Sequence, residues 1–397
     1  MIPILLHLEE PPASLAAATA PRPPALVAPA PREVSFGRIA GRVSAGTVRV
    51  VVRVDGTARK AVPVAGPGRF SFPVRLPSRD VSVRVLAVGA SGQRAGTTVA
   101  PVYGLPRSAR PGATRRSVQD HRLTRRLRPL ARDFGGTAAF YVQDLRTGRG
   151  AAWNAGARFP AASTLKLPVA MEVLRRLQGR PAAGSSLDRL LWRMLVYSDN
   201  AATNSLLVWL GGSTSGGAAH VNALMRSLGL QNSLMYGGYA IGTAAATPIP
   251  VRVNEQPAFG IGKYTTAYDL IRLHRAVHQA AGGRGPLPAA APGFSRRDGR
   301  YLLWILAHVA DRGKLDRFLP ESTSVFHKAG WIRHARHDAG IVYWRGGAYV
   351  VAVMTWNGGG VGSASDVLAG RIAARSLHRF DRLRARGSTT AVAAITA

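Results

Sequence analysis

The chain has 397 residues, more than one domain usually holds, and its length predicts two folded units. It contains no cysteine, which excludes disulfide frameworks, thiolate metal sites and cysteine nucleophiles. Its 53 Lys and Arg against 20 Asp and Glu give a formal net charge of +33. Such an excess attracts polyanions, but the cations are mostly arginines spread along the chain. This pattern favours arginine-rich residue usage over a nucleic-acid-binding arm, and we expect no nucleic-acid partner.

Residues 1–32 are rich in Pro and Ala, a composition that predicts an extended tether. The first ten residues include a short apolar stretch with no basic segment before it, so they resemble at most a degenerate signal region. No run in the sequence approaches the roughly 18 apolar residues that a membrane-spanning helix needs. We therefore expect no transmembrane segment.

Residues 33–103 have the period-two pattern of short strands separated by turns. Within 48–54, valines recur at every second position, and Arg49 and Arg53 lie between them. The pattern predicts a small all-β sandwich of immunoglobulin-like size. No polar constellation marks it as catalytic, so it is either a packing scaffold or a wall-facing spacer. The Pro- and Gly-containing segment 104–113 is predicted to be a linker.

Residues 114–380 predict a second, α+β domain in which helices pack against one antiparallel sheet, followed by a tail at 381–397. Helical periodicity occurs at 115–134, 165–177, 187–195, 201–210, 217–228, 265–278, 300–309 and 364–380. Strands are expected at 137–142, 149–153, 325–328, 339–344 and 348–355.

Ser163 and Lys166 form the one S-x-x-K motif of the chain, at the start of an apolar helix. One helical turn places the lysine amine on the same face as the serine hydroxyl. The helix start also supplies backbone N–H groups where an oxyanion would form. The motif therefore predicts a serine nucleophile with an amine beside it.

The lysine usage supports this assignment independently of the motif. Only five of the 53 cations are lysines, yet two of them occupy motif positions, Lys166 and Lys328. A guanidinium cannot lose its proton near neutral pH, whereas a desolvated amine beside another cation can become a base. We infer that position 166 requires a titratable amine.

Two further motifs follow in the order S-x-x-K, S-D-N, K-x-G. Ser198-Asp199-Asn200 lies between two predicted helices, and Lys328-Ala329-Gly330-Trp331 lies on a late strand. The series resembles the class A β-lactamases and the penicillin-binding D,D-peptidases. The resemblance covers roughly residues 114–380 and implies the β-lactamase/transpeptidase-like fold.

The resemblance implies a catalytic set of Ser163, Lys166, Ser198 and Lys328. Ser163 would attack the acyl carbon while Lys166 helps to take its proton. Ser198, next to Lys328, would pass the proton to the leaving nitrogen. Each residue alone also has an ordinary structural explanation, such as a helix cap or a solvated strand cation.

The resemblance also implies a substrate-binding set of Asn200, Gly330 and Trp331. Asn200 would bind the substrate amide, and Lys328 would attract a substrate carboxylate. The backbone N–H groups of Ser163 and Trp331 would form the oxyanion hole. Asp199 is expected to be a buried hydrogen-bonding strut.

The sequence departs from the family pattern in three places. The E-x-x-L-N loop, whose Glu activates the deacylating water, is absent, and Glu255 is the one acid between residues 230 and 263. Glu255 is thus a candidate deacylation base, although an exposed loop acid is the simpler interpretation. Ala329 replaces the hydroxyl residue of K-T-G, and the segment between Ser163 and Ser198 is shorter than usual. We therefore expect Ser163 to be acylated but β-lactam turnover to be slow or absent.

His327, His334, His337 and Asp338 could be proposed as metal ligands, since imidazole and carboxylate suit zinc. No helix aligns them, and histidines at the surface or at the rim of the substrate site are favoured over a metal site. No metal and no cofactor are expected.

The leading hypothesis is a monomeric serine hydrolase acting on a β-lactam or an acyl-D-Ala-type peptide, secreted or in the cell envelope as in this family. The alternative is a non-catalytic module with a lactamase-like fold that binds anionic cell-wall polymers. An intact acylation set argues against the alternative, because a binding module does not need it.

Overall fold

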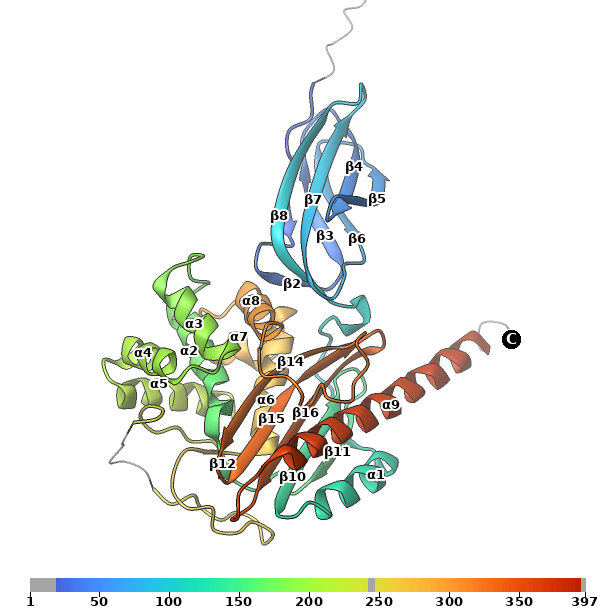
Figure 1. The fold of residues 1–397 in the computed structure, drawn as a ribbon. Coiled ribbons are helices and arrows are strands. Elements are labelled where there is room, and N and C mark those ends of the chain that lie inside the picture. Colours follow the sequence, from blue (N-terminus) through green and yellow to red (C-terminus); the bar gives the residue numbers. More distant parts are fainter. Residues whose placement is uncertain (1–18, 242–246, 394–397) are drawn as a thin grey trace, which may run out of the picture. The chain divides into compact units, whose positions relative to one another are not determined.

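The structure is a computed structural model that describes residues 19–241 and 247–393 (Figure 1). The chain divides into two compact units. The smaller unit comprises residues up to 29 with 39–74 and 82–99, and the larger comprises 30–38, 75–81 and the chain from residue 100 on. No helix among the described residues is both long and apolar enough to cross a membrane.

The smaller unit is all β, with strands belonging to two sheets. The three-stranded sheet has the order β1 (Ala25–Ala28), β3 (Arg38–Val43), β6 (Gly68–Pro73). The five-stranded sheet has the order β2 (Glu33–Ser35), β8 (Arg94–Gly104), β7 (Asp80–Gly89), β4 (Thr47–Val54), β5 (Thr57–Pro63), with its β2 end in the larger unit. Strand β1 lies within the segment that composition predicted to be a tether.

The expected valine alternation in β4 is observed with one exception. Val50, Val52 and Val54 are buried, but Val48 is 45% exposed. A register shift between Thr47 and Arg49 in the pairing of β4 with β7 moves Val48 out of phase, and Thr47 is buried instead. The period-two pattern therefore located the strand but not this bulge.

The larger unit is built on a six-stranded sheet. Its order is β14 (Ser324–Ile332), β15 (Ala335–Trp344), β16 (Gly347–Trp356), β10 (Thr137–Asp144), β11 (Arg149–Trp153), β9 (Val118–Gln119). All neighbouring strands are antiparallel except β11 and β9, which are parallel. Strand β14 is an edge strand, so part of its backbone is not used by the sheet.

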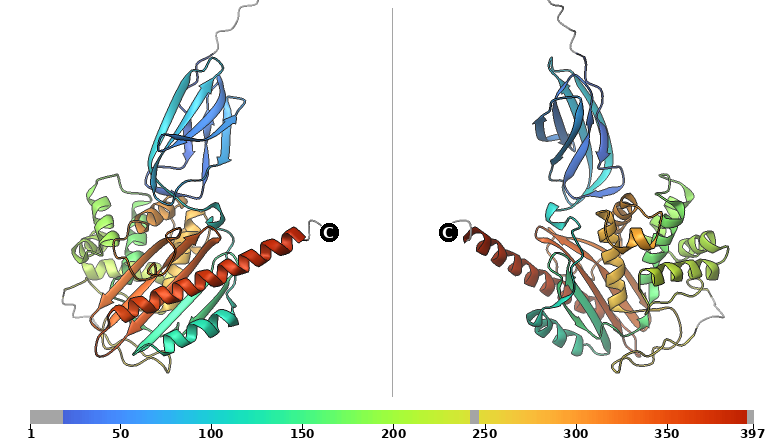
Figure 2. Two further views of the ribbon diagram at one scale, coloured as in Figure 1. Left: turned by 45° about the vertical axis from the view of Figure 1, so that its right-hand side comes forward. Right: turned by 180° about the vertical axis from the view of Figure 1, so that it is seen from behind.

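Helices cover both faces of this sheet, giving the expected α+β arrangement (Figures 1 and 2). Residues of β16 alternate between the two cores: Val350, Ala352 and Met354 face one, and Val351 and Val353 face the other. The helices are α1 (His121–Arg132), α2 (Lys166–Leu177), α3 (Ser186–Val196), α4 (Asn200–Gly211), α5 (Thr214–Ser227), α6 (Ala267–Ala281), α7 (Pro286–Ala290), α8 (Arg296–Leu306) and α9 (Ser363–Ala393). Helices α1 and α9 pack on one face, and α2 to α6 with α8 contribute to the core on the other.

Several helix ends differ by two to four residues from the sequence prediction, and three helices differ more. Helix α9 continues beyond residue 380, where a tail was expected, and Asp381 accepts a hydrogen bond from Trp344 at 3.2 Å. Helix α7 was not predicted because it is only five residues long and contains two prolines. Helix α1 begins six residues later than predicted, because Asp120 caps it by accepting from the Leu123 backbone N–H at 3.0 Å.

Asp120 also joins α1 to α9. Its buried carboxylate accepts from the Arg379 Nε at 2.8 Å, so one side chain serves as a helix cap and as an ion-pair partner. We expect Asp120→Ala to lower the free energy of unfolding by about 2 to 4 kcal/mol, because it removes the cap and leaves Arg379 unpaired. Urea unfolding measures this.

The matched control is Asp133→Ala, at the exposed C-terminal end of the same helix. This change should alter the free energy of unfolding by less than about 0.5 kcal/mol. Equal effects of the two substitutions would contradict the role assigned to Asp120.

Candidate functional site

Ser163 lies in a single 3-10 turn, η2 (Ala162–Leu165), that runs directly into α2. The Lys166 N–H donates to the Ser163 carbonyl, so the two residues are one turn apart. Ala162 has a φ of +47°, an uncommon left-handed conformation for a residue with a side chain. This turn leaves Ser163 half-buried, at the start of a helix as the sequence predicted.

Lys166 is fully buried. Its Nζ donates to the Ser198 carbonyl at 2.5 Å and to the Asn200 Oδ1 at 2.6 Å, and it lies 3.4 Å from the Ser198 Oγ. Burial and the positive charges of Lys328 and Lys263 together lower the pKa of Lys166 to about 7, although the negative charge of Asp199 acts in the opposite direction. An amine with this pKa is partly neutral at neutral pH.

Ser198 lies between α3 and α4 and has a φ of +59°. Its Oγ accepts a hydrogen bond from the Lys328 Nζ at 2.9 Å. The Ser198 hydroxyl therefore contacts amines from two different elements, α2 and β14.

Lys328 is buried on the edge strand β14. Burial lowers the pKa of Lys328 to about 8, although the charges of Asp311 and Asp338 act in the opposite direction. The Nζ also donates to the Ala329 carbonyl at 2.9 Å. Ala329 itself is buried and offers no side-chain hydroxyl.

Gly330 brings β14 against the Ser163 turn. A Cβ at Gly330 would lie 2.7 Å from the Ser163 N and 2.8 Å from the Thr164 N, so only glycine fits. Trp331, the next residue, is 63% exposed. The backbone of this strand end thus lies beside the N–H groups that begin the helix.

The other residues of the S-D-N motif have separate positions. Asp199 caps α4 by accepting from the Ala202 N–H at 2.9 Å and pairs with the Arg193 Nε at 2.8 Å. It is half-buried, not buried as predicted, because it faces the exposed Arg193 side chain. Asn200 is exposed while its Oδ1 accepts from Lys166.

The structure does not bring Glu255 to this cluster. Its side chain is exposed, and no hydrogen bond or ion pair of the described residues joins it to Ser163, Lys166 or Ser198. The neighbouring Gln256 is the buried residue, and its Oε1 accepts from the Arg158 N–H at 2.8 Å.

Two residues at the cluster were missed by sequence reasoning. The Lys166 Nζ lies 4.8 Å from the centre of the Tyr239 ring, and the Lys263 Nζ lies 4.7 Å from the same centre. The scarcity of lysine was a signal for Lys263, since three of the chain's five lysines converge here. No signal in the sequence singled out Tyr239.

Of the three histidines expected at the surface or at the rim of the substrate site, His334 is half-buried, and its Nδ1 lies 3.3 Å from the Asn357 carbonyl, but the other two are not at the surface. His327 and His337 are both buried. The His327 Nδ1 donates to Asp338 at 2.7 Å, and the His337 Nε2 lies 2.7 Å from the Pro160 carbonyl. Burial lowers the pKa of His337 to about 4. Among the residues that the structure describes, no group of three or more His, Cys, Asp or Glu side chains could hold a metal ion.

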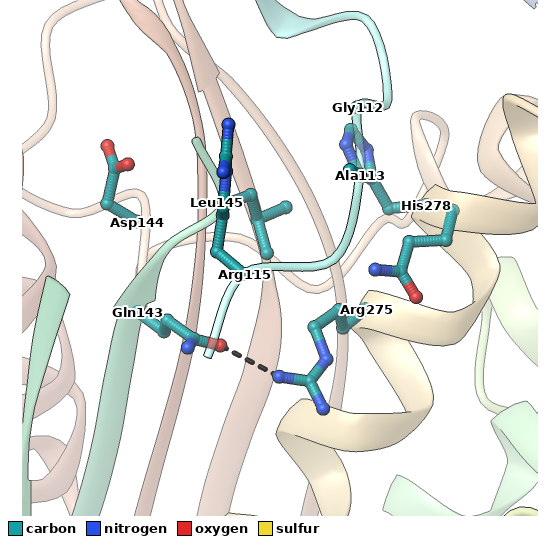
Figure 3. Close-up of a pocket in the computed structure, with 9 residues that line it drawn as sticks. Gly112, Ala113, Arg115, Gln143, Asp144, Leu145, Arg275 and His278 are labelled. Atoms are coloured by element: carbon teal, nitrogen blue, oxygen red, sulfur yellow. Dashed lines mark hydrogen bonds between the residues drawn. The ribbon is translucent and has the colours of Figure 1, made fainter. Parts of the chain in front are cut away.

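A separate pocket lies beside α6 and β10 (Figure 3). In it the Arg275 Nη1 donates to the Gln143 Oε1 at 3.0 Å. The pocket is lined by Gly112, Ala113, Arg115, Gln143, Asp144, Leu145, Arg275, His278 and Gln279. None of these residues belongs to the Ser163 cluster.

The model of the β-lactamase enzyme family matches residues 122–183 and 178–380, which include every residue of the cluster. The chain belongs to the β-lactamase enzyme family. This confirms the resemblance inferred from the three motifs.

A carbapenem-hydrolysing β-lactamase, KPC, of Klebsiella oxytoca is 33% identical over 125 residues. That match spans 25% of this chain and 41% of the KPC enzyme.

Solved structures share the fold of the family domain. PBP-A matches with a TM-score of 0.55 and 20% identity, over 68% of this chain and all of PBP-A. An ancestral class A β-lactamase matches with a TM-score of 0.51 and 21% identity, over 65% of this chain and 99% of the ancestral enzyme. The β-lactamase of Streptomyces albus G matches with a TM-score of 0.50 and 22% identity, over 65% of this chain and 99% of the Streptomyces enzyme.

The lowered pKa of Lys166 has a consequence for stability. Its pKa is about 7 in the folded protein and 10.5 for an ordinary lysine, so between these pH values the unfolded chain binds a proton that the folded protein lacks. Native stability therefore rises with pH across this interval. We expect Lys166→Met to be more stable than the wild type by about 2 kcal/mol at pH 6, after allowance for lost hydrogen bonds.

This advantage should shrink as the pH rises above about 7 and reverse before pH 10.5, because the wild-type amine is then neutral in both states and only the lost hydrogen bonds of the variant remain. Denaturant unfolding at several pH values measures it. Lys60→Met, in the smaller unit, is the control and should show no such pH-dependent gain. A Lys166→Met gain that does not change with pH would contradict the lowered pKa.

Proposed function

We propose that this chain is a serine acyl-enzyme hydrolase in which Ser163 attacks an amide or β-lactam carbonyl. The observation that carries the proposal is the Ser198 hydroxyl, which lies 2.9 Å from the Lys328 amine and 3.4 Å from the Lys166 amine. Two buried amines with lowered pKa values on one hydroxyl suit proton transfer and serve no evident structural purpose.

Neutral Lys166 has two N–H donors and one lone pair. The donors have acceptors in the Ser198 carbonyl and the Asn200 Oδ1, so the lone pair is left to take a proton. In the proposed step the Ser163 Oγ bonds to the carbonyl carbon while its proton moves to Lys166. The proton then passes through the Ser198 hydroxyl to the leaving nitrogen as the carbon–nitrogen bond breaks, and Lys166 is neutral again.

Backbone groups and Lys328 would bind the substrate. The Ser163 N–H lies at the start of η2 and the Trp331 N–H on the edge strand beside it, and we propose these two as the oxyanion hole. Lys328 would attract a substrate carboxylate, and Asn200 would bind the substrate amide. Because Ala329 has no hydroxyl group, it cannot form a hydrogen bond with that carboxylate, and binding of the carboxylate is weaker.

We propose that the acyl-enzyme is cleared slowly. Hydrolysis needs a base that activates water, and exposed Glu255 forms no hydrogen bond or ion pair with the described residues of the cluster. A β-lactam or an acyl-D-Ala-type peptide is the proposed substrate class. We propose a secreted or cell-envelope location because members of this family usually work outside the cytoplasm. We propose that the smaller, all-β unit is an immunoglobulin-like spacer.

The second candidate is a non-catalytic module that binds anionic wall polymers, and the net charge of +33 favours it. Retention of two buried amines at the Ser198 hydroxyl argues against it, because burying amines costs stability that a binding module need not give up.

The test is incubation with a reporter penicillin, followed by intact-mass measurement at several pH values. We expect a covalent adduct that persists, formed at a rate that rises with pH around a midpoint near 7, because Lys166 must be neutral. Ser163→Ala should give no adduct.

Lys166→Arg should slow acylation by at least about a hundredfold, because a guanidinium keeps its proton. Lys60→Arg is the matched control and should acylate at the wild-type rate. If the wild type forms no adduct, the proposed acyl-enzyme is wrong. If the adduct forms but is lost rapidly, the proposal of slow turnover is wrong.

A further inference from the structure

Tyr239 is packed against the base of the proposed reaction. Its side chain is 8% exposed, and both the Lys166 and the Lys263 amines lie within 5 Å of its ring centre, at 4.8 and 4.7 Å. Its hydroxyl is buried with no hydrogen-bond partner among the described residues. The position of this ring is therefore set by its packing in the hydrophobic core, by its contacts with the amines and by its backbone.

The backbone of Tyr239 is fixed from two sides. The Asn204 side chain on α4 accepts from the Tyr239 N–H at 2.7 Å and donates to the Tyr239 carbonyl at 2.9 Å. The Lys263 Nζ donates to the Gly238 carbonyl at 2.6 Å, and the Lys263 carbonyl accepts from the Ala161 N–H at 2.8 Å. Lys263 thus links the Tyr239 loop to the segment that leads into Ser163.

The ring and the hydrogen bonds together occupy several sides of the Lys166 amine. Two N–H groups of the amine donate to the Ser198 carbonyl and to the Asn200 Oδ1, and the Tyr239 ring covers another side of the amine. Of the described acids, Asp199 alone acts on the charge of Lys166, and it is engaged as a helix cap with Arg193 as its partner. The acid that acts on Lys166 is thus already engaged, and the Tyr239 ring lies on one side of the amine.

We propose that Tyr239, held by Asn204 and Lys263, excludes hydrolytic water from the acyl-enzyme and thereby makes the acyl group on Ser163 long-lived. This inference rests on the proposed function, since it needs an acyl-enzyme. Tyr239 and Lys263 are positioning residues in this account, because they act on the environment of Lys166 and touch no reacting atom. The account differs from the absence of a base alone, because it predicts faster hydrolysis when the volume of the Tyr239 side chain is removed.

The two residues should also shift the pH dependence of acylation in opposite directions. A ring next to an ammonium group stabilises its charge by about 0.5 to 1 kcal/mol, so Tyr239→Leu should move the acidic limb down by roughly half a pH unit. The Lys263 charge disfavours protonation of Lys166, so Lys263→Met should move this limb upward. Substitution of a residue with only a structural role would leave the acidic limb of the pH profile unchanged.

The experiment measures acylation and deacylation rate constants separately with the reporter penicillin, for the full chain and its variants. Tyr239→Ala opens space beside the amine and should speed deacylation at least about tenfold while acylation stays within about threefold. Tyr239→Phe keeps nearly all of the side-chain volume and Tyr239→Leu keeps much more of it than alanine does, so their deacylation should stay within about twofold of the wild type. Lys263→Met should speed deacylation less than Tyr239→Ala does.

Thermal unfolding of each variant checks that it is folded, and Lys263→Met tests the inference if Tyr239→Ala does not fold. A wild-type deacylation rate in both of these variants overturns the inference and leaves the proposed function standing. Equally fast deacylation in Tyr239→Leu and Tyr239→Ala also overturns it, because volume would then not be the cause. A wild type that forms no adduct overturns the proposed function itself.

Discussion

The site depends on two amines buried on either side of one hydroxyl. Lys166 and Lys328 are both buried, and each lies within hydrogen-bonding distance of the Ser198 Oγ. Removing an ammonium group from water is costly, and a second positive charge nearby raises the cost, so both groups release protons more easily than a surface lysine. The pKa values of about 7 and about 8 follow from this burial.

The fold brings three separate elements to this point. Helix α2 presents Lys166 one turn after Ser163, the connection between α3 and α4 presents Ser198 at a positive φ, and edge strand β14 presents Lys328. Gly330 allows the strand to approach the Ser163 backbone. Sheet, helix start and loop must therefore all form before the amines are desolvated, so the chemistry depends on tertiary packing.

Much of this was accessible from the sequence, because motif spacing and hydrophobic periodicity act locally. The S-x-x-K spacing predicted the Ser163 turn, and the periodicity predicted the main helices and the long strands. Features that depend on distant contacts were not accessible. The exposure of Val48 depends on a bulge against a neighbouring strand, and the burial of His327 depends on Asp338 across a hairpin. Tyr239 was missed for the same reason, since Asn204 on another element fixes it.

The central claim is that the Lys166 amine is largely neutral near pH 7 to 8 because it is buried beside Lys328. With only five lysines in the chain, 15N-lysine NMR can follow each amine, with Lys→Met variants for assignment. The account predicts that Lys166 titrates with a midpoint near pH 7 and Lys328 near pH 8. Titration of all five lysines above pH 10 would contradict it.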